Sequence, residues 1–167
     1  MVKVLIKKLN PSVKLPSYKT NGASGMDLMA FIEKPIDLEP GKSCLVPTGL
    51  TVAFPEKYEI QIRPRSGLAA KNQISVLNTP GTIDADYRGE LKVILINLGT
   101  KSFLVENGAR IAQMVLCPII KANLKEVKTL ENTQVKKKSP EIPLKYGQTI
   151  LLQCYAMEDR YLTGNRE

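Results

Sequence analysis

The chain has 167 residues, of which 43% are hydrophobic and 24% are charged, a composition that suits one globular domain with a core of its own. It contains no histidine, which excludes Ser-His and Cys-His nucleophile pairs and histidine-ligated zinc sites. The formal net charge is +8, but the basic residues are spread out and aromatic residues are few, so we do not expect nucleic-acid binding as its main role. Attraction of a polyphosphate substrate explains the sign of the charge equally well.

The sequence predicts neither a membrane protein nor a secreted one. No apolar run approaches the roughly 20 residues that a transmembrane helix needs. Residues 1–10 alternate Val and Ile with Lys, which argues against a secretory signal. Cys44, Cys117 and Cys154 are far apart and lack the spacing of metal ligands. We therefore expect a reducing, cytoplasmic location.

Up to about residue 120 the sequence predicts short strands separated by turns. Val2, Val4 and Ile6 alternate with lysines, which is typical of a half-exposed strand with Lys3 and Lys7 on its outer face. Further strands are predicted at residues 43–46, 50–54, 58–62, 91–96, 103–105 and 111–116.

Gly and Pro pairs mark the turns between these strands. Asn107-Gly108, between two apolar runs, is the strongest hairpin signal, because both residues tolerate positive φ. Only residues 66–71 look helical, and they span little more than one turn. The spacing argues for an all-β fold, either a sandwich or a barrel.

The composition changes after Pro118. Residues 121–143 are rich in lysine, carry two prolines near their end and lack periodicity, so we expect a linker or an extended arm. Residues 150–152, Ile-Leu-Leu, are compatible with one more strand or with a short helix.

Two segments carry residues suited to ligand contact. Residues 22–28, Gly-Ala-Ser-Gly-Met-Asp-Leu, include two glycines that let the backbone approach a ligand closely, although a plain loop with a solvated Asp27 explains them too. Arg65, Ser66 and Gly67 open the predicted helix. Ser66 is placed to cap it, while free amides and the Arg65 guanidinium suit a phosphate. In the alternative, Ser66 only caps a turn and Arg65 is solvated.

Residues 78–90, Asn-Thr-Pro-Gly-Thr-Ile-Asp-Ala-Asp-Tyr-Arg-Gly-Glu, are the most informative segment. The Asn78 side chain offers both an acceptor and donors, which suits the imide edge of uracil. Backbone amides around Gly81 and Thr82 would complete that recognition.

An extended backbone in this segment would put Asp84 and Asp86 on one face and Ile83 and Tyr87 on the other. Tyr87 packed flat on a sugar would leave no room for a 2′-hydroxyl, and a carboxylate beside it would hold a water for attack on a phosphate. The alternative is a hairpin with two turn aspartates and a structural Tyr87.

Gln113 interrupts an otherwise apolar strand. A polar residue there is costly unless a ligand, a backbone group or a neighbouring subunit partners it. For Gln113 taken alone, a structural hydrogen bond is the preferred prediction.

In order and spacing, these four segments resemble motifs one to four of the trimeric dUTPase family over roughly residues 1–130. The resemblance rests on Arg65-Ser66-Gly67, on residues 81–89 (Gly-Thr-Ile-Asp-Ala-Asp-Tyr-Arg-Gly) and on residues 110–113 (Arg-Ile-Ala-Gln). It implies a jelly-roll-like β-fold and a homotrimer with three active sites at the subunit interfaces.

The resemblance also implies a reaction and a role for individual residues. It implies that dUTP is hydrolysed to dUMP and pyrophosphate with Mg²⁺, and that Asp84 positions the water that attacks the α-phosphate. Tyr87 would stack on the deoxyribose, and Asp27 would touch the metal only through water. The substrate-binding residues implied are Arg65, Ser66, Gly67, Asn78, Gly81, Thr82, Ile83, Asp84, Tyr87, Lys92 and Gln113.

The chain departs from this family at its end, where a glycine-rich fifth motif with a phenylalanine is normally found. Residues 131–134, Glu-Asn-Thr-Gln, resemble its usual approach, but no phenylalanine follows. We therefore expect a β-domain at 1–130 and a departing C-terminal arm at 131–167, whose tail is either a foreign sequence or a substitute for the motif. The candidate substitutes are Lys136, Lys137, Lys138 and Arg160 for the phosphates and Tyr146 and Tyr155 for the base.

Two other functions fit parts of the pattern. The missing motif suggests a trimer that binds dUTP or dUMP with impaired catalysis and serves as a sensor or interaction module. A dCTP deaminase-like member of the same broad superfamily is a weaker alternative, because Asn78, Asp84 and Tyr87 match the uracil-reading segment of dUTPases better.

Overall fold

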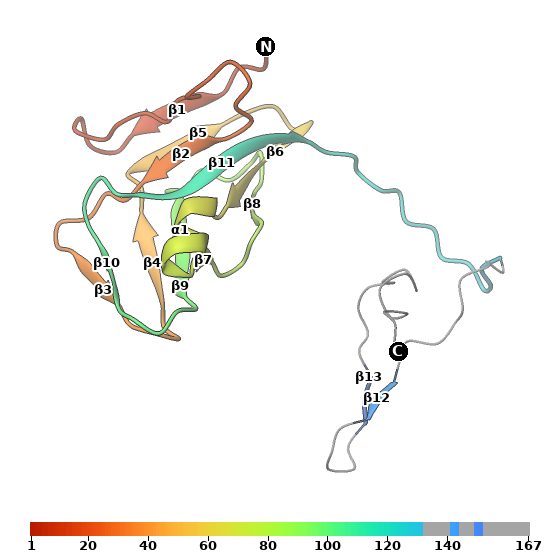
Figure 1. The fold of residues 1–167 in the computed structure, drawn as a ribbon. Helices are drawn as coiled ribbons and strands as arrows, with labels where there is room; N and C mark the ends of the chain where they lie inside the picture. The colour runs from red at the N-terminus through yellow and green to blue at the C-terminus, as the bar shows by residue number, and fades with distance from the viewer. Residues whose placement is uncertain (132–140, 144–148, 152–167) are drawn as a thin grey trace. The chain divides into compact units, whose positions relative to one another are not determined.

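The computed structural model describes residues 1–131, 141–143 and 149–151. The chain divides into two compact units, residues 1–122 and residues 123–167. The first unit consists of short strands and one helix of seven residues, which confirms the predicted all-β fold (Figure 1). Within the described part of the chain, no helix has the length and apolar character that crossing a bilayer requires.

The elements lie close to the predicted runs, with α1 (Ser66–Asn72) beginning at the predicted residue. In the second unit, β12 (Glu141–Pro143) pairs with β13 (Thr149–Leu151), so the run compatible with strand or helix is a strand as far as Leu151. The strands of the first unit are β1 (Leu5–Lys8), β2 (Met26–Met29), β3 (Ile36–Leu38), β4 (Ser43–Pro47), β5 (Leu50–Ala53), β6 (Tyr58–Arg63), β7 (Ile74–Val76), β8 (Gly81–Ile83), β9 (Lys92–Asn97), β10 (Phe103–Val105) and β11 (Arg110–Pro118).

Two antiparallel sheets form the body of the first unit. One has the strand order β2-β11-β6-β8 and the other the order β4-β9-β7, while β1 pairs with β5 and β3 with β10. Strands far apart in the sequence therefore lie side by side, as β11 does between β2 and β6 (Figure 1). Long-range pairing of this kind is a property of jelly-roll folds.

Both sheets contribute side chains to one hydrophobic core. Leu28, Ile60 and Met114 from the first sheet are 0% exposed, as are Val46 and Leu95 from the second. Successive side chains of a strand point to opposite faces, so one face of each sheet is buried and the other is open. The core lies between the sheets, and the candidate site residues lie on these strands and in the connections at their ends.

The Asn107-Gly108 turn is present but does not form a hairpin. Gly108 has a φ of 77°, which favours glycine. However, β10 pairs with β3, while β11 pairs with β2 and β6, so the chain changes partners at this turn. The hairpin prediction is therefore wrong, because turn residues fix only the local backbone, whereas burial of the two apolar runs decides which strands pair.

A buried polar side chain, Asn97, ties the end of β9 to its surroundings. Asn97 is 0% exposed. Its Nδ2 donates to the carbonyls of Leu38 and Lys101, both at 2.8 Å, and its Oδ1 accepts from Gly99 N at 2.9 Å. Both donors and the acceptor are engaged, so the cost of burying this amide is offset.

We expect Asn97→Leu to lower the free energy of unfolding by about 3 kcal/mol, because two carbonyls and one amide lose their partner in a buried place. Urea unfolding followed by circular dichroism measures this change. Thr100→Ala, at an exposed position in the same connection, is the control and should stay within about 0.5 kcal/mol of the unmodified chain. Equal stability of the Asn97→Leu chain would contradict this account.

Candidate active site

The connection from β6 to α1 carries the first group of candidate residues. Arg65 takes the N-cap position in an extended conformation, with φ of −92° and ψ of 126°, and no side chain caps the helix. Ala69 N donates to Arg65 O at 3.0 Å. Ser66 is therefore the first helical residue, and its prediction as the cap is wrong because the chain leaves the extended conformation one residue earlier. Ser66 and Gly67 are exposed at this helix start.

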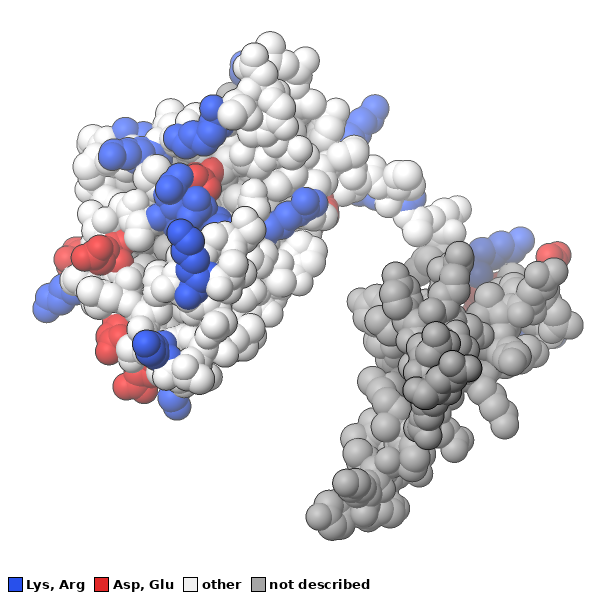
Figure 2. All heavy atoms as spheres, in the orientation of Figure 1, with Lys and Arg blue, Asp and Glu red and all other residues white. Residues whose placement is uncertain are grey.

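Asp27 on β2 holds two arginine side chains. Its Oδ1 accepts from Arg65 Nε at 2.8 Å, and its Oδ2 accepts from Arg110 Nη1 at 3.3 Å. The Asp27 side chain is 15% exposed, so it is not the solvated residue of the simpler interpretation. Figure 2 shows basic side chains gathered around an acidic group over β2, β11 and α1. One carboxylate between two guanidinium groups fixes both and leaves a net positive charge for an anion.

Gln113 connects β11 to the same region. Its Nε2 donates to Pro64 O at 2.9 Å, so the structural hydrogen bond predicted for it is present. Gln113 lies opposite Asp27 on one side and opposite Arg63 on the other. A Cβ atom at position 25 would lie 2.5 Å from Gln113 Oε1, so glycine at this position gives the amide its space.

The second group of candidate residues begins at Asn78 and continues along β8. This strand pairs with β6, with Gly81 opposite Ile62 and Ile83 opposite Ile60. A Cβ atom at position 81 would lie 3.2 Å from Asn78 Nδ2. The close approach of the Asn78 amide to the strand therefore depends on a glycine. Thr82, which follows Gly81 on β8, is exposed.

The chain turns directly after β8. Tyr87 N donates to Asp84 O at 3.1 Å, which closes a turn over Ala85 and Asp86. The predicted alternation of faces from Ile83 to Tyr87 is therefore wrong, because extended pairing ends at Ile83. The alternative of aspartates at a turn describes Asp84 and Asp86 correctly, and both are exposed.

Tyr87 folds back over the residues that follow it. Its hydroxyl donates to Glu90 O at 2.9 Å. A Cβ atom at position 89 would lie 2.6 Å from Tyr87 Cζ, so the ring covers Gly89 closely. The side chain remains 42% exposed, which leaves ring surface available to a ligand.

Glu90 was not among the residues predicted from the sequence. Its Oε1 accepts from Gly49 N at 2.8 Å, and its Oε2 lies 3.7 Å from Lys92 Nζ. Lys92 is the exposed first residue of β9, in the second sheet. The sequence does show an acidic residue at position 90, between Gly89 and an apolar strand. That pattern alone does not reveal that its partner is Gly49, which is 41 positions away.

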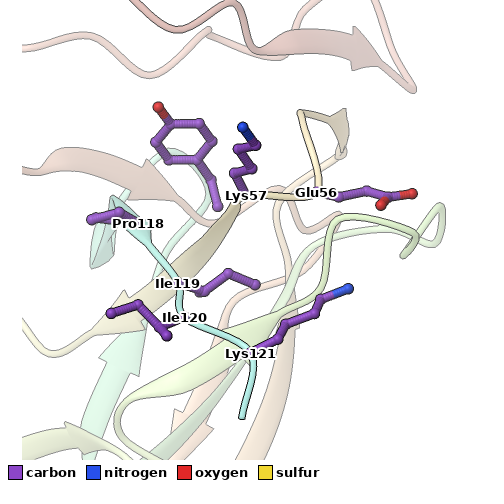
Figure 3. Close-up of a pocket in the computed structure, with 7 residues that line it drawn as sticks. Glu56, Lys57, Pro118, Ile119, Ile120 and Lys121 are labelled. Carbon is purple, nitrogen blue, oxygen red and sulfur yellow. The ribbon is translucent and has the colours of Figure 1, made fainter. Parts of the chain in front are cut away.

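Asp84 lines a hollow of about 350 Å³ at the end of β6 that is opposite to α1. The hollow was not predicted, because its walls come from three separate segments. Its lining residues are Glu56, Tyr58, Glu59, Asp84, Ala85, Asp86, Ile119 and Lys121. Figure 3 shows the adjoining pocket, where Glu56 and Lys57 precede β6 and residues 118–121 follow from β11.

Strand β6 separates Asp84 from the Asp27–Arg65–Arg110 cluster, whereas Gly81 lies opposite Ile62, near the end of β6 that leads to Arg65. Ile83 lies opposite Ile60, and Asp84 and Glu59 line the same hollow. Arg65 lies six residues beyond Glu59, which at roughly 3.3 Å per residue is about 20 Å along the strand. Among the described residues, no hydrogen bond or ion pair joins Asp84 to the Asp27–Arg65–Arg110 cluster. The chain therefore presents this cluster and the hollow beside Asp84 as two separate candidate half-sites.

The sequence was compared with known families and proteins. The family model described as dUTPase matches residues 12–141, which include the cluster around Asp27 and the segment from Asn78 to Lys92. The chain belongs to the dUTPase family. A deoxyuridine 5′-triphosphate nucleotidohydrolase of Rickettsia bellii (strain OSU 85-389) is 57% identical over 134 residues, 80% of this chain and 89% of that protein. One of Hydrogenobaculum sp. (strain Y04AAS1) is 53% identical over 133 residues, 80% of this chain and 92% of that protein.

Solved dUTPase structures share the fold of this chain. The dUTPase of Staphylococcus bacteriophage 80alpha aligns with a TM-score of 0.70 at 25% identity, covering 78% of this chain and 99% of that one. The dUTPase of phage phi11 of S. aureus gives the same TM-score and coverage at 22% identity. The jelly-roll-like β-fold implied by the sequence motifs is therefore confirmed.

The carboxylates of this dUTPase suit a metal carried by a nucleotide. Among the described residues, no group of three or more His, Cys, Asp or Glu side chains could hold an ion by itself. Asp27 is the carboxylate of the cationic cluster, and both of its oxygens accept from arginines. Mg²⁺ usually keeps several waters and uses one or two carboxylates together with substrate phosphates. The donor set fits that mode and not a closed protein cage.

We expect Gly25→Ala to displace the Gln113 side chain, because the added methyl group meets its flexible end. The bond to Pro64 O should be lost, at a cost of about 1 kcal/mol in the free energy of unfolding. Amide hydrogen exchange at residues 65–67 should become faster. Gly22→Ala is the matched control in the same segment, because a Cβ there has no neighbour within 4 Å. Unchanged exchange in Gly25→Ala would show that Gln113 does not support this connection.

Proposed function

We propose that the chain hydrolyses dUTP to dUMP and pyrophosphate, as the names of its close relatives describe for those proteins. The observation that carries the proposal is the match of the dUTPase family model across residues 12–141, which spans both half-sites. The cationic cluster around Arg65 suits a triphosphate, and the Asn78–Tyr87 segment suits a deoxynucleoside.

The separation of the half-sites supports a homotrimer with an active site at each subunit interface. Arg65 and Asp84 of one copy lie at opposite ends of β6, about 20 Å apart along the backbone, which favours a site that takes them from different copies. Leu45 on β4 lies opposite Ile94 on β9, and Leu77 N donates to Ile94 O. These three residues form an apolar row on the outer face of the second sheet, with Leu45 55% and Leu77 51% exposed. A subunit interface would cover this row.

In the proposed complex, one subunit holds the nucleoside. Asn78 and the backbone of Thr82, Ile83 and Asp84 bind uracil, with Gly81 giving the base close access. Tyr87 lies on the deoxyribose, and Lys92 lines the base pocket. A cytosine presents a donor where uracil presents an acceptor, and one unmatched buried polar pair costs about 1–3 kcal/mol.

The neighbouring subunit holds the phosphates through Arg65, Ser66 and Gly67, with Gln113 supporting that connection. The Asp84 carboxylate takes a proton from a water as the water oxygen bonds to the α-phosphorus, and the bond to the bridging oxygen of pyrophosphate breaks. Asp27 would hold Mg²⁺ through a water, and the ion would supply charge neutralisation on the triphosphate. The protein contributes chiefly position and electrostatics.

We expect Asp84→Asn to reduce the turnover of dUTP by roughly 10²–10⁴-fold, the usual contribution of a general base. Nucleotide binding should persist, because the substitution keeps size and removes one charge. Pyrophosphate release with dUTP and magnesium measures turnover, and calorimetry with a non-hydrolysable dUTP analogue measures binding. Normal hydrolysis by this variant would show that Asp84 is not the base. Activity on dCTP, dTTP and UTP should be low in the unmodified protein.

We expect Leu45→Lys to weaken the trimer, because it places a charge in the apolar row. Light scattering after gel filtration should show smaller species, and turnover per subunit should fall with them. Leu104→Lys, at a 52% exposed leucine on β10 outside the row, is the matched control. A Leu45→Lys protein that stays trimeric would show that another face forms the interface.

A second candidate function is nucleotide binding with impaired catalysis, favoured by the missing glycine-rich motif in the proposed arm at 131–167. The residues named as substitutes for that motif, together with Cys154, lie outside the described residues. Calorimetry with dUMP beside the turnover assay separates binder from enzyme. The same pair of measurements on a chain ending at Thr133 shows whether the arm contributes to catalysis, which a lid over the nucleotide would do by excluding water.

A further inference from the structure

Tyr87 is held in place by two residues that have no part in the proposed contacts with the nucleotide. Its hydroxyl donates to the backbone carbonyl of Glu90 at 2.9 Å. Its ring covers Gly89 so closely that a Cβ atom there would lie 2.6 Å from Tyr87 Cζ and closer still to the hydroxyl oxygen. The ring is therefore restrained at its tip by a hydrogen bond and on one face by a glycine backbone.

The carbonyl that receives the Tyr87 hydroxyl is itself anchored to another part of the fold. Glu90 Oε1 accepts from Gly49 N at 2.8 Å, and the Glu90 side chain is 21% exposed. The next residue, Leu91, donates to Leu50 O at 2.8 Å and accepts from the buried Thr48 hydroxyl at 2.6 Å. Residues 90–91 are thus joined on both sides to the β4–β5 connection, which gives the Tyr87 hydroxyl a rigid partner.

We propose that Gly89 and Glu90 are specificity-determining positioning residues, which fix the Tyr87 ring so that a sugar carrying a 2′-hydroxyl is excluded. The inference rests on the proposed function, in which Tyr87 lies on the deoxyribose. Exclusion of a single oxygen atom requires a wall that does not yield, because a ring free to pivot would make room for it. The Tyr87 ring makes the steric contact that excludes the oxygen atom, while Gly89 and Glu90 keep the ring in position.

Gly89→Ala tests the glycine side of this arrangement. The new methyl group would meet the far end of a side chain and not backbone, so the ring should move while the fold persists. We expect the ratio of kcat/KM for dUTP to that for UTP to fall by about ten-fold or more, within the range of discrimination that packing against one small group provides. Thr100→Ala, at an exposed position after β9 and outside the site, should leave the ratio unchanged.

Glu90→Ala and Glu90→Gln test the anchor. The alanine variant loses the acceptor for Gly49 N, whereas glutamine keeps an oxygen there and loses the charge that faces Lys92. Relaxed selectivity in Glu90→Ala and its rescue in Glu90→Gln are the expected results. Tyr87→Phe, which keeps the ring and removes only its hydrogen bond, should relax the ratio as well and does not depend on the folding of the other variants.

The outcomes separate the two levels of the argument. An unmodified protein that does not hydrolyse dUTP overturns the proposed function. An unmodified protein that prefers dUTP, together with Gly89→Ala and Glu90→Ala proteins that keep the same dUTP-to-UTP ratio, overturns this inference alone. Equal loss of activity toward both substrates also overturns it, because that result describes a general structural role.

Discussion

The length and stiffness of β6 govern how this protein forms a site. Gly81 lies opposite Ile62, but Asp84 lies beside the hollow at the far end of the strand from Arg65, about 20 Å away along it. The strand cannot bend to bring them together, because it pairs with β11 on one side and with β8 on the other. In the proposed trimer, assembly would complete the active site, and a subunit interface would cover the apolar row on the outer sheet face.

The candidate residues share a common mode of support. Some lie on strands and others in the connections that follow them, and several are held by hydrogen bonds from a side chain that is distant in sequence. Asp27 fixes Arg65, Gln113 fixes Pro64, and Glu90 fixes the segment after Tyr87. Such contacts supply the preorganisation that catalysis by position and charge requires. Gly25 gives the Gln113 side chain its space, and a methyl group there would remove it.

Much of the architecture follows from the sequence, because burial alternates along short strands. The runs around Tyr58–Arg63 and Phe103–Val105 and the start of α1 were predicted closely. Pairing was predicted less well: the Asn107-Gly108 turn joins strands with different partners, since local φ values do not decide which edge is available. The turn after Ile83 was missed because the alternation of side chains between two faces holds only where the backbone is extended.

Among the site residues, those carried by the family's motifs were named from the sequence, whereas their supports were not. The link from Glu90 to Gly49 spans 41 positions, and no local pattern predicts such a contact.

The proposed site, divided between subunits, also has a consequence for the cell. If every working centre is shared between copies, a folded but solitary subunit is catalytically silent, so output should rise more steeply than in proportion to the amount of protein made until association is complete. The concentration of the protein would then set both the fraction of subunits that are active and the total activity.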